Sequence, residues 1–472
     1  MRGERGGWWW AATIVLAGLL ACERAPAPRR EPPLRNVLLI SIDSLRADHL
    51  GCYGHARDTS PTLDRLAAEG VRFANAQSPS SWTLPAHATL LSGAAQARHG
   101  ATTADGTIAT DVPLLAEMLR ERGLHTAGFY SGPFLHPAFG FDRGFDAYVA
   151  CQEPETAGQP AHERALDRSH RDTTNPLVEA AVRRWAQSPP ATPFFAFVHM
   201  WDVHYDYIPP ARYVEMFDPE YRGRFDGRDI IEAGFPLDIA PRDLVHLLAR
   251  YDGEIRWTDD TIATMLRVLE TAGLLDDTLV VVTADHGDEF LEHGDKGHQK
   301  TLYEEVTRVP LIFWAARGLP AGRIVETPVA LADVVPTVLD VLGMAPPPGL
   351  AGRSLAPLWR GETTRHPPVT GLLFLTYGGG AALVQATIRD GPRKVRFLPA
   401  RRQWHEYALD RDPSEQSPLA VTRTDLQADL TERMTHASGA LVRQLAANAA
   451  QRTTPAVPGH VTDHLRALGY VE

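Results

Sequence analysis

A hydroxyl side chain, Thr83, precedes a short segment that has the pattern of a helix. Pro85 suits a first helical turn, where no backbone N–H is needed, and Gly93 suits the far end. A hydroxyl at a helix start faces unpaired backbone N–H groups and the positive end of the helix dipole, which hold tetrahedral oxyanions well. His87 lies four residues on and is expected on the same face. The pattern predicts a nucleophile, although threonine at this place also serves as an ordinary helix cap.

Two carboxylates and an imidazole follow apolar runs elsewhere in the chain. One run ends at Asp43, and another ends at Asp285, which His286 follows. Such runs are typical of strands buried in a parallel sheet, and ligands gather at the carboxyl ends of those strands. If the two strands are neighbours, both acids, the imidazole and the Thr83 hydroxyl surround one point. This set predicts a divalent-metal site for Mn, Mg, Ca or Zn, without choosing among them.

The elements that must position these residues alternate along the chain. Strand-like runs cover residues 36–42, 194–198, 278–284 and 311–314, and helical patterns cover 112–122, 250–273 and 333–342. Asp111 is the expected cap of the first helix, and Gly123 its expected stop. The alternation predicts an α/β fold with a doubly wound, mostly parallel sheet.

The pattern changes near residue 362. Shorter strand-like pieces cover residues 372–375, 383–388 and 394–397, and a helical pattern covers 425–449. We therefore expect a catalytic α/β domain over residues 36–361 and a smaller C-terminal α+β subdomain over residues 362–472.

The first residues have the layout of an export signal. An apolar run follows two arginines and ends in Leu19-Leu20-Ala21-Cys22, which resembles a bacterial lipobox. We expect a signal peptide over residues 1–21, lipidation of Cys22, and attachment to a bacterial membrane in the periplasm or outer membrane. Residues 22–35 are rich in proline and predict an extended tether. An uncleaved anchor is the alternative, but the run is short against the roughly 20 residues that span a bilayer.

Composition narrows the function further. The 472-residue chain carries a formal net charge of -11, which argues against nucleic acid as a partner, because nucleic-acid binders carry a basic bias. A basic cluster within residues 389–402 is either a guide for an anionic substrate or a solvated face. Cys52 and Cys151 are too few for a disulfide framework, and whether they form one bridge is left open.

Taken in order, these segments resemble the sulfatase family of the alkaline phosphatase superfamily. In that family, Cys or Ser, any residue, Pro, any residue and Arg open a helix that ends in Thr-Gly. Thr83, Pro85, His87 and Ser92-Gly93 stand at the corresponding places. Further similar segments are Asp43–Gly54, Gly140–Asp146, Asp285–Leu311, Asp333–Gly352, Tyr407–Glu415 and the tail Leu465–Val471. The resemblance covers nearly the whole exported chain and implies an ester hydrolase with an anionic substrate, such as a glycan or lipid ester.

The resemblance also implies roles for individual residues. It places four residues as ligands of a divalent metal, namely Asp43, Thr83, Asp285 and His286. His204 falls on the histidine that protonates the leaving group. His298 falls where sulfatases have a substrate-binding lysine, and Lys300 is a nearby substitute.

Several positions depart from the family pattern. Ser44 replaces a second acidic ligand, and His87 replaces the arginine that supports the nucleophile. Phe129 and Ser131 stand where sulfatases have two cationic or imidazole contacts to the substrate, which leaves Ser131 as a candidate contact. A doubly charged monoester therefore loses more partners than a singly charged diester or phosphonate does.

The nucleophile is the main departure. Sulfatases oxidise Cys or Ser to formylglycine, an aldehyde whose hydrate attacks sulfur. Oxidation of threonine gives only a ketone, so no formylglycine is expected at Thr83. A threonine hydroxyl can still attack phosphorus. The sequence thus predicts a metal-dependent hydrolase of a phosphate diester, phosphonate or sulfate ester. A phosphoryl transferase to a lipid or glycan alcohol, and an inactive anion-binding or glycan-binding lipoprotein, are the alternatives.

Overall fold

The computed structural model describes residues 34–152, 173–191, 193–228, 237–377, 380–451 and 457–467. The expected signal peptide, Cys22 and nearly all of the tether lie outside the described residues, as does the tail after residue 467. Within the described ranges, no helix combines the length and the apolar character needed to cross a bilayer. Export and lipid anchoring therefore stay predictions.

An eight-stranded sheet forms the centre of the α/β part. In spatial order its strands are β12 (Arg323–Val325), β2 (Val71–Phe73), β11 (Leu311–Trp314), β7 (Thr278–Ala284), β1 (Asn36–Ile42), β6 (Phe194–Met200), β4 (His125–Tyr130) and β5 (Ala147–Ala150). Of these strands, β11 alone runs antiparallel to its neighbours. The sheet is mostly parallel, as the sequence predicts.

The register of β1 brings the two acidic strand ends together. Strand β1 lies between β7 and β6, and Ile42 pairs with Ala284 on one side and Met200 on the other. Every residue of β7 and of β6 is buried, which explains their continuous apolar runs. The chain therefore leaves β1 and β7 at the same edge of the sheet, one residue before Asp43 and Asp285.

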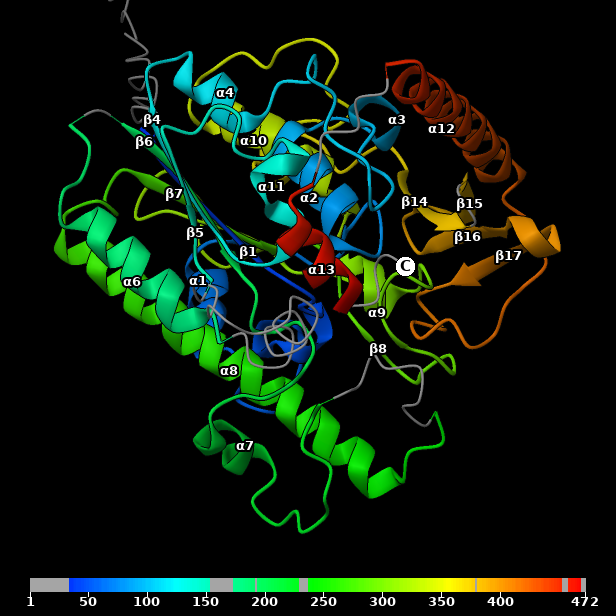
Figure 1. Cartoon of the computed structure of the whole chain (residues 1–472), viewed down its shortest axis with the longest axis horizontal. Coiled ribbons are helices and arrows are strands. Elements are labelled where there is room, and N and C mark those ends of the chain that lie inside the picture. The colour runs from blue at the N-terminus through cyan, green and yellow to red at the C-terminus, as the bar shows by residue number, and fades with distance from the viewer. Residues whose placement is uncertain are drawn as a thin grey trace, which may run out of the picture. The chain divides into compact units, whose positions relative to one another are not determined.

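Helices cover both faces of this sheet. Helices α6 (Asn175–Ala186) and α8 (Pro241–Thr271) lie on one side, and α2 (Thr83–Ser92), α4 (Leu115–Arg120) and α10 (Val334–Val341) lie on the other (Figure 1). The doubly wound prediction is confirmed.

Several further elements are short. The helices are α1 (Pro61–Glu69), α3 (Gln96–His99), α7 (Ala211–Phe217), α9 (Glu304–Thr307), α11 (Ala356–Trp359) and α13 (Gly459–Ala467). The strands are β3 (Ala76–Gln77), β8 (Glu289–Phe290), β9 (Lys296–Gly297), β10 (Arg308–Val309) and β13 (Val329–Ala330). The 3-10 turns are η1 (Ala47–His49), η2 (Gly51–Tyr53), η3 (Pro133–Leu135), η4 (Pro137–Phe139), η5 (Leu331–Asp333) and η6 (Pro399–Arg401).

Two predicted helix starts are wrong. Helix α8 begins at Pro241, nine residues before the predicted start; its first five residues are exposed or half-buried, and its buried residues begin at His246. Helix α4 begins at Leu115, and the Glu117 carboxylate accepts the Leu114 backbone N–H at 2.8 Å. Asp111 is therefore not the cap; its carboxylate pairs with Arg98 at 2.9 Å.

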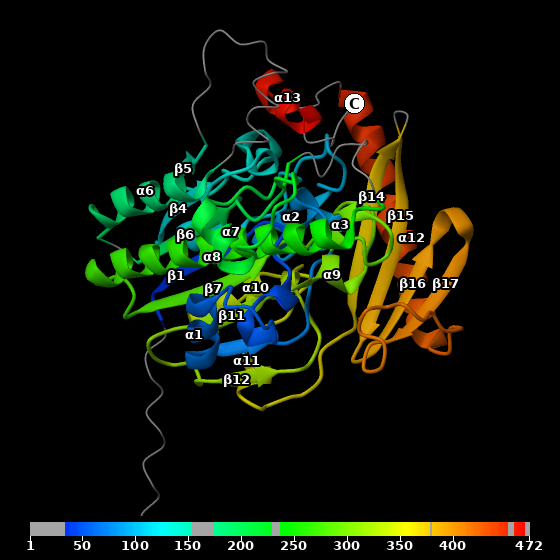
Figure 2. The same cartoon turned by 90° about the horizontal axis from the view of Figure 1, so that it is seen from below.

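A four-stranded antiparallel sheet makes up most of the C-terminal part. Its order is β14 (Val369–Tyr377), β15 (Gly380–Asp390), β16 (Arg393–Leu398) and β17 (Gln403–Ala408). Helix α12 (Thr424–Gln451) packs along it (Figure 2). Phe374 and Ile388 of the sheet join Leu430 of the helix in a hydrophobic cluster separate from the main core. The smaller α+β part is confirmed, whereas its boundary at residue 362 stays a prediction.

The basic cluster in this sheet is partly buried, so neither sequence-based interpretation holds for its buried members. Lys394 Nζ lies 3.0 Å from Glu304 Oε1 and 3.1 Å from Glu415 Oε2. Arg389 also pairs with Glu304, and the Arg396 guanidinium lies over the Tyr303 ring. These contacts join β15 and β16 to α9 and the residue before it.

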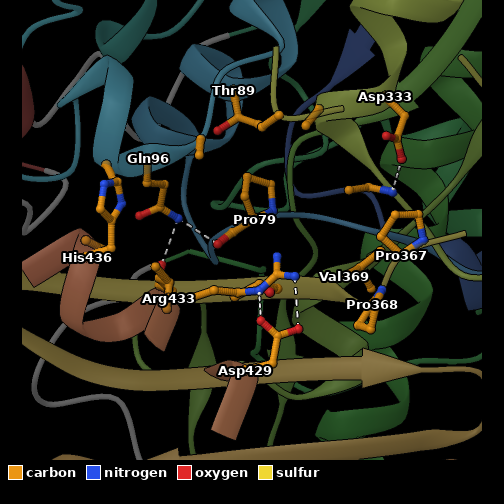
Figure 3. Close-up of a pocket in the computed structure, with 18 of the residues that line it drawn as sticks. Pro79, Thr89, Gln96, Asp333, Pro367, Pro368, Val369, Asp429, Arg433 and His436 are labelled. Atoms are coloured by element: carbon orange, nitrogen blue, oxygen red, sulfur yellow. Dashed lines mark hydrogen bonds and ion pairs between the residues drawn. The ribbon is translucent and has the colours of Figure 1, made fainter. Parts of the chain in front are cut away.

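A cavity of about 480 Å³ lies where α12 and the start of β14 meet α2 and α3. Figure 3 shows the Arg433–Asp429 ion pair beside it, with Gln96 Nε2 donating to Pro79 O at 2.7 Å. Thr89 of α2 contributes to the lining, six residues beyond the helix start. The cavity therefore adjoins the C-terminal half of α2.

Elsewhere in the described chain, Cys52 and Cys151 are free thiols, so the bridge left open by the sequence is not formed.

Candidate active site

The buried helix α2 carries the proposed nucleophile at its first position. Thr83 begins the helix, and Trp82 before it is extended. Gly93 ends it in the left-handed region with φ 66°, and its N–H donates to Thr89 O at 2.8 Å. All ten residues of α2 are buried. The helix predicted from Pro85 and Gly93 is confirmed, and it fixes the Thr83 hydroxyl at the edge where β1 and β7 end.

The four predicted metal ligands come together there. Thr83 Oγ1 donates to Asp43 Oδ2 at 3.3 Å and lies 3.5 Å from His286 Nε2. His286 Nε2 lies 3.3 Å from Asp285 Oδ2 and 3.6 Å from Asp43 Oδ1. The two carboxylates and the imidazole are fully buried. The structure therefore assembles two acids, one imidazole and one hydroxyl from two strands and one helix.

The electrostatics of this group fit a bound cation. Burial raises the pKa of Asp43 to about 6, against the opposing effect of His286. Burial raises the pKa of Asp285 to about 7, and the charge of Asp43 adds to the rise. Asp285 Oδ2 is buried and has no hydrogen-bond partner. A divalent cation would neutralise both carboxylates, and the Asp285 Oδ2 atom could coordinate it. The residues present therefore fit the metal that the sequence predicts.

His87 contacts the backbone at the start of α2. Its Nδ1 donates to Thr83 O at 3.0 Å, because a carbonyl only accepts, and its Nε2 lies 2.9 Å from Ser41 Oγ. Burial lowers the pKa of His87 to about 3, despite the nearby Asp285 carboxylate. The imidazole is therefore neutral, and it holds the Thr83 backbone without supplying the positive charge of an arginine.

His199 belongs to the same group and was not predicted as a site residue. It lies on β6 in register with Ser41 of β1, and its Nε2 is 3.3 Å from Asp43 Oδ2. Its Nδ1 is buried without a hydrogen-bond partner, and burial lowers the pKa of the imidazole to about 4. The available signal was one imidazole inside an otherwise apolar strand, which becomes informative only once β6 is known to adjoin β1.

His204 and His298 lie beside this group. The His298 ring centroid is 4.3 Å from that of His286 and 5.1 Å from that of His204. His204 stacks on Trp201 at 3.9 Å, and its Nδ1 donates to Tyr205 O at 2.8 Å. The structure therefore brings His298 against the metal group and His204 against His298.

Asp288 holds His298 and was also missed by the sequence analysis. His298 Nδ1 contacts Asp288 Oδ1 at 2.7 Å, and the Tyr207 hydroxyl donates to Asp288 Oδ2 at 2.5 Å. His286, Asp288 and His298 could form a second ligand group. However, His286 Nδ1 contacts Gly287 O at 3.1 Å, which leaves only its Nε2 for a metal. That atom lies with the first group, so Asp288 and His298 are better explained as partners of each other.

A third group of metal-ligand type lies apart in the sequence. Asp252 contacts His49 Nδ1 at 2.6 Å and His55 Nε2 at 3.2 Å. Arg57 donates to the same carboxylate at 2.6 Å. Since a guanidinium already neutralises Asp252, this group is an ion-pair cluster.

Two predicted substrate contacts make other interactions. Ser131 Oγ is buried and donates to His199 O at 3.0 Å. Lys300 Nζ pairs with Asp295 Oδ1 at 2.5 Å and donates to Lys296 O at 3.0 Å. Phe129, at the other altered family position, packs against Trp185 in the core. The described contacts thus tie Ser131 and Lys300 to neighbouring backbone and to Asp295.

The fold and the donor set define an ester hydrolase of the alkaline phosphatase superfamily. A family model described as Sulfatase matches residues 35–344, which is more than half of the chain. A second, described as N-sulphoglucosamine sulphohydrolase, C-terminal, matches residues 292–439. The chain belongs to the sulfatase family, whose members are metal-dependent.

Individual relatives span most of the chain. Human arylsulfatase A is 27% identical over 460 residues, covering 89% of this chain and 84% of that protein. A protein solved with its substrate D-glucosamine-2-N,6-O-disulfate has a TM-score of 0.70 at 20% identity, covering 87% and 99%. The phosphonate monoester hydrolase of Agrobacterium radiobacter has a TM-score of 0.69 at 24% identity, covering 87% and 96%. The protein is accordingly an ester hydrolase of the sulfatase family.

Proposed function

We propose that this protein is an exported, metal-dependent hydrolase that cleaves a phosphate diester, phosphonate or sulfate ester through Thr83, with phosphorus esters as its preferred substrates. The observation that carries the proposal is the place of the Thr83 hydroxyl. It sits on the first residue of a buried helix, 3.3 Å from Asp43 Oδ2 and 3.5 Å from His286 Nε2. A hydroxyl between a carboxylate and an imidazole, on a helix start, is suited to attack an anionic ester.

The chemistry of threonine favours phosphorus over sulfur. The carbon that bears the Thr83 hydroxyl also bears a methyl group, so oxidation there gives a ketone. Ketones hydrate poorly, and the aldehyde hydrate used by sulfatases is not accessible from this residue. Direct attack by the hydroxyl oxygen on phosphorus needs no such modification.

The residues of the site support a reaction in two displacements at phosphorus. Thr83 Oγ1 loses its proton to solvent water and forms a bond to phosphorus, while the bond from phosphorus to the leaving oxygen breaks. His204 gives that oxygen a proton, and its place beside His298, which contacts His286, supports this role. Water then attacks phosphorus and gives a proton to His204, the bond from phosphorus to Thr83 Oγ1 breaks, and Oγ1 regains a proton from solvent water. His87 holds the backbone of Thr83 throughout.

A divalent cation held by Asp43, Thr83, Asp285 and His286 would supply a Lewis acid that polarises the ester oxygens and lowers the pKa of the Thr83 hydroxyl.

The departures from the family pattern set the charge of the substrate. Phe129 and Ser131 replace two charged or imidazole contacts and engage other parts of the protein. A singly charged diester or phosphonate monoester suits such a site better than a dianion. The structural similarity to a phosphonate monoester hydrolase agrees with this choice.

The wider substrate is an anionic ester of a glycan or lipid. The protein solved with a disulfated glucosamine supports a glycan. Attachment to a membrane through Cys22 rests on the lipobox-like sequence alone. Labelled fatty acid should enter the full-length chain in a bacterial host and should not enter Cys22→Ala.

The proposal is tested with a panel of model esters. Purified protein, loaded separately with Mn²⁺, Ca²⁺, Mg²⁺ or Zn²⁺, is given bis(4-nitrophenyl) phosphate, 4-nitrophenyl phenylphosphonate and 4-nitrophenyl sulfate. We expect turnover of the phosphorus diester or phosphonate, some turnover by Thr83→Ser, and loss of turnover in Thr83→Ala with metal still bound. Undiminished turnover in Thr83→Ala would refute the role of Thr83. Consumption of an added alcohol in place of water would make the protein a transferase.

A further inference from the structure

A buried acid between His199 and His204 has no role in the chemistry proposed above. Asp202 lies in the loop that follows β6, and its side chain is buried. Its carboxylate accepts the Thr174 backbone N–H at 2.7 Å and the Thr174 hydroxyl at 2.9 Å. It also accepts the Asn175 backbone N–H. Since α6 begins at Asn175, one side chain fastens the loop after β6 to the start of that helix.

The fastened point is itself tied to a second helix. Asn175 Nδ2 donates to Thr258 Oγ1 of α8 at 3.0 Å, and both residues are buried. Helices α6 and α8 pack against each other on one face of the sheet (Figure 1). Asp202 therefore attaches the loop to a packed pair of helices.

The place of His204 depends on this loop. The His204 backbone N–H donates to Trp201 O at 2.8 Å, which closes a turn that contains Asp202. The imidazole stacks on Trp201, and its Nδ1 donates to Tyr205 O, and in the proposed reaction Nε2 is the nitrogen that gives a proton to the leaving group. A shift of the turn would move this nitrogen directly, with little effect on the ligands carried by β1 and β7.

We propose that Asp202 is a positioning residue for the reaction. By fastening the loop of residues 201–205 to α6, it holds His204 Nε2 at the leaving oxygen. This inference rests on the proposed function, in which His204 protonates the leaving group. It predicts that loss of Asp202 damages proton donation selectively, leaving the attack by Thr83 largely intact.

Leaving-group dependence separates these two effects. A 4-nitrophenolate leaves readily without a proton, whereas phenolate needs one more strongly. The metal-loaded full-length protein is therefore assayed with 4-nitrophenyl phenylphosphonate and with phenyl phenylphosphonate. For Asp202→Asn we expect kcat to fall about 10- to 100-fold with the phenyl ester, as for a catalytic group misplaced by about 1 Å. With the nitrophenyl ester we expect a fall of less than about threefold.

Asp259→Asn is the matched control. Asp259 is also a buried acid that accepts two N–H groups at a helix start, from Thr62 at 2.8 Å and Leu63 at 2.9 Å. It serves α1, so its loss should cost stability without changing the ratio of the two rates. Thr174→Ala keeps the Thr174 N–H bond to Asp202 and removes only the hydroxyl. It should change the ratio in the same direction by a smaller factor, and it provides a milder variant should Asp202→Asn fold poorly.

His204→Gln distinguishes the two ways in which the inference can fail. If His204→Gln changes the ratio of rates and Asp202→Asn does not, Asp202 is a structural residue only. An equal fall with both esters in Asp202→Asn, matched by Asp259→Asn, leads to the same conclusion. If His204→Gln itself leaves the ratio unchanged, the proton-donor role fails, and the inference about Asp202 fails with it. Turnover by Thr83 would then still stand as a separate result.

Discussion

The hydroxyl oxygen of Thr83 lies 3.3 Å from the Oδ2 atom of Asp43. This contact joins the first residue of helix α2 to the residue that follows the central strand β1. Strand β1 is held on both sides by parallel partners, and α2 is buried along its whole length. The proposed nucleophile and the Asp43 carboxylate are therefore fixed by buried elements of the fold, as a preorganised site requires.

Asp285→Asn should stabilise the metal-free protein at high pH. In that state the Asp285 carboxylate is buried beside Asp43 with one oxygen unpaired, and its pKa is raised to about 7. Above that pH the charge is costly, and an amide removes it; we expect a gain of about 1–3 kcal/mol. Urea unfolding at pH 8 with EDTA measures the gain.

The same substitution should abolish stabilisation by added metal, because it removes a ligand. Below the raised pKa, near pH 5, the wild-type carboxyl is protonated and the advantage of the variant should shrink. A metal-free variant that is less stable than the wild type at pH 8, and that still gains stability from Mn²⁺, would contradict the assignment of Asp285 as a metal ligand.

Lys394→Met should destabilise the protein strongly. Lys394 Nζ is buried between Glu304 and Glu415, and its removal takes the lysine partner from the buried Glu415 carboxylate, while Glu304 keeps its pair with Arg389. We expect a loss of about 3–5 kcal/mol in the free energy of unfolding. Arg65→Met is the matched control, since it breaks a half-exposed pair with Glu69 and should cost less than about 1 kcal/mol. Equal losses in the two variants would mean that the buried network contributes no more than a surface pair.

His366 should make stability depend on pH. Burial acts to lower the pKa of this imidazole, but the contact of its Nε2 with Asp333 Oδ2 at 3.0 Å outweighs burial, and the pKa is raised. A raised histidine pKa gives stability that is complete below the unfolded value of about 6.5 and is lost as the pH rises through the folded value. The stability difference between the wild type and His366→Gln should therefore shrink from pH 6 to pH 9.

Chemical unfolding at several pH values follows that difference. His436→Gln is the control. His436 is exposed on α12 and, like His366, lines the cavity between α12 and the start of β14. A constant difference for His366→Gln would refute the charged pair with Asp333.

Much of the site was predictable because its residues follow strong local patterns. The apolar runs that end at Asp43 and Asp285 are long, and such runs identify central strands in a parallel sheet. Pro85 and Gly93 mark the bounds of the helix that starts with Thr83. Strand adjacency then follows from the topology, and the observed register of β1 with β7 agrees with it.

Other features depend on contacts between distant segments, which local patterns do not encode. His199 becomes part of the site only because β6 pairs with the other side of β1. Asp288 resembles any loop acid until His298 is brought to it. Strand β17 was not predicted from the sequence. It lies at the edge of its sheet and carries Gln403, His405 and Glu406 in place of an apolar run. The expected substrate contact of Lys300 stays a prediction, and the structure adds a pair between its Nζ and Asp295.

The stereochemical course at phosphorus tests the central claim most directly. Two successive in-line displacements through Thr83 each invert phosphorus, so the overall reaction retains configuration. Direct attack by water inverts it once. The measurement is hydrolysis of one enantiomer of 4-nitrophenyl phenylphosphonothioate in ¹⁸O-labelled water by the metal-loaded protein. We predict net retention, together with loss of turnover in Thr83→Ala; net inversion would contradict a covalent intermediate on Thr83.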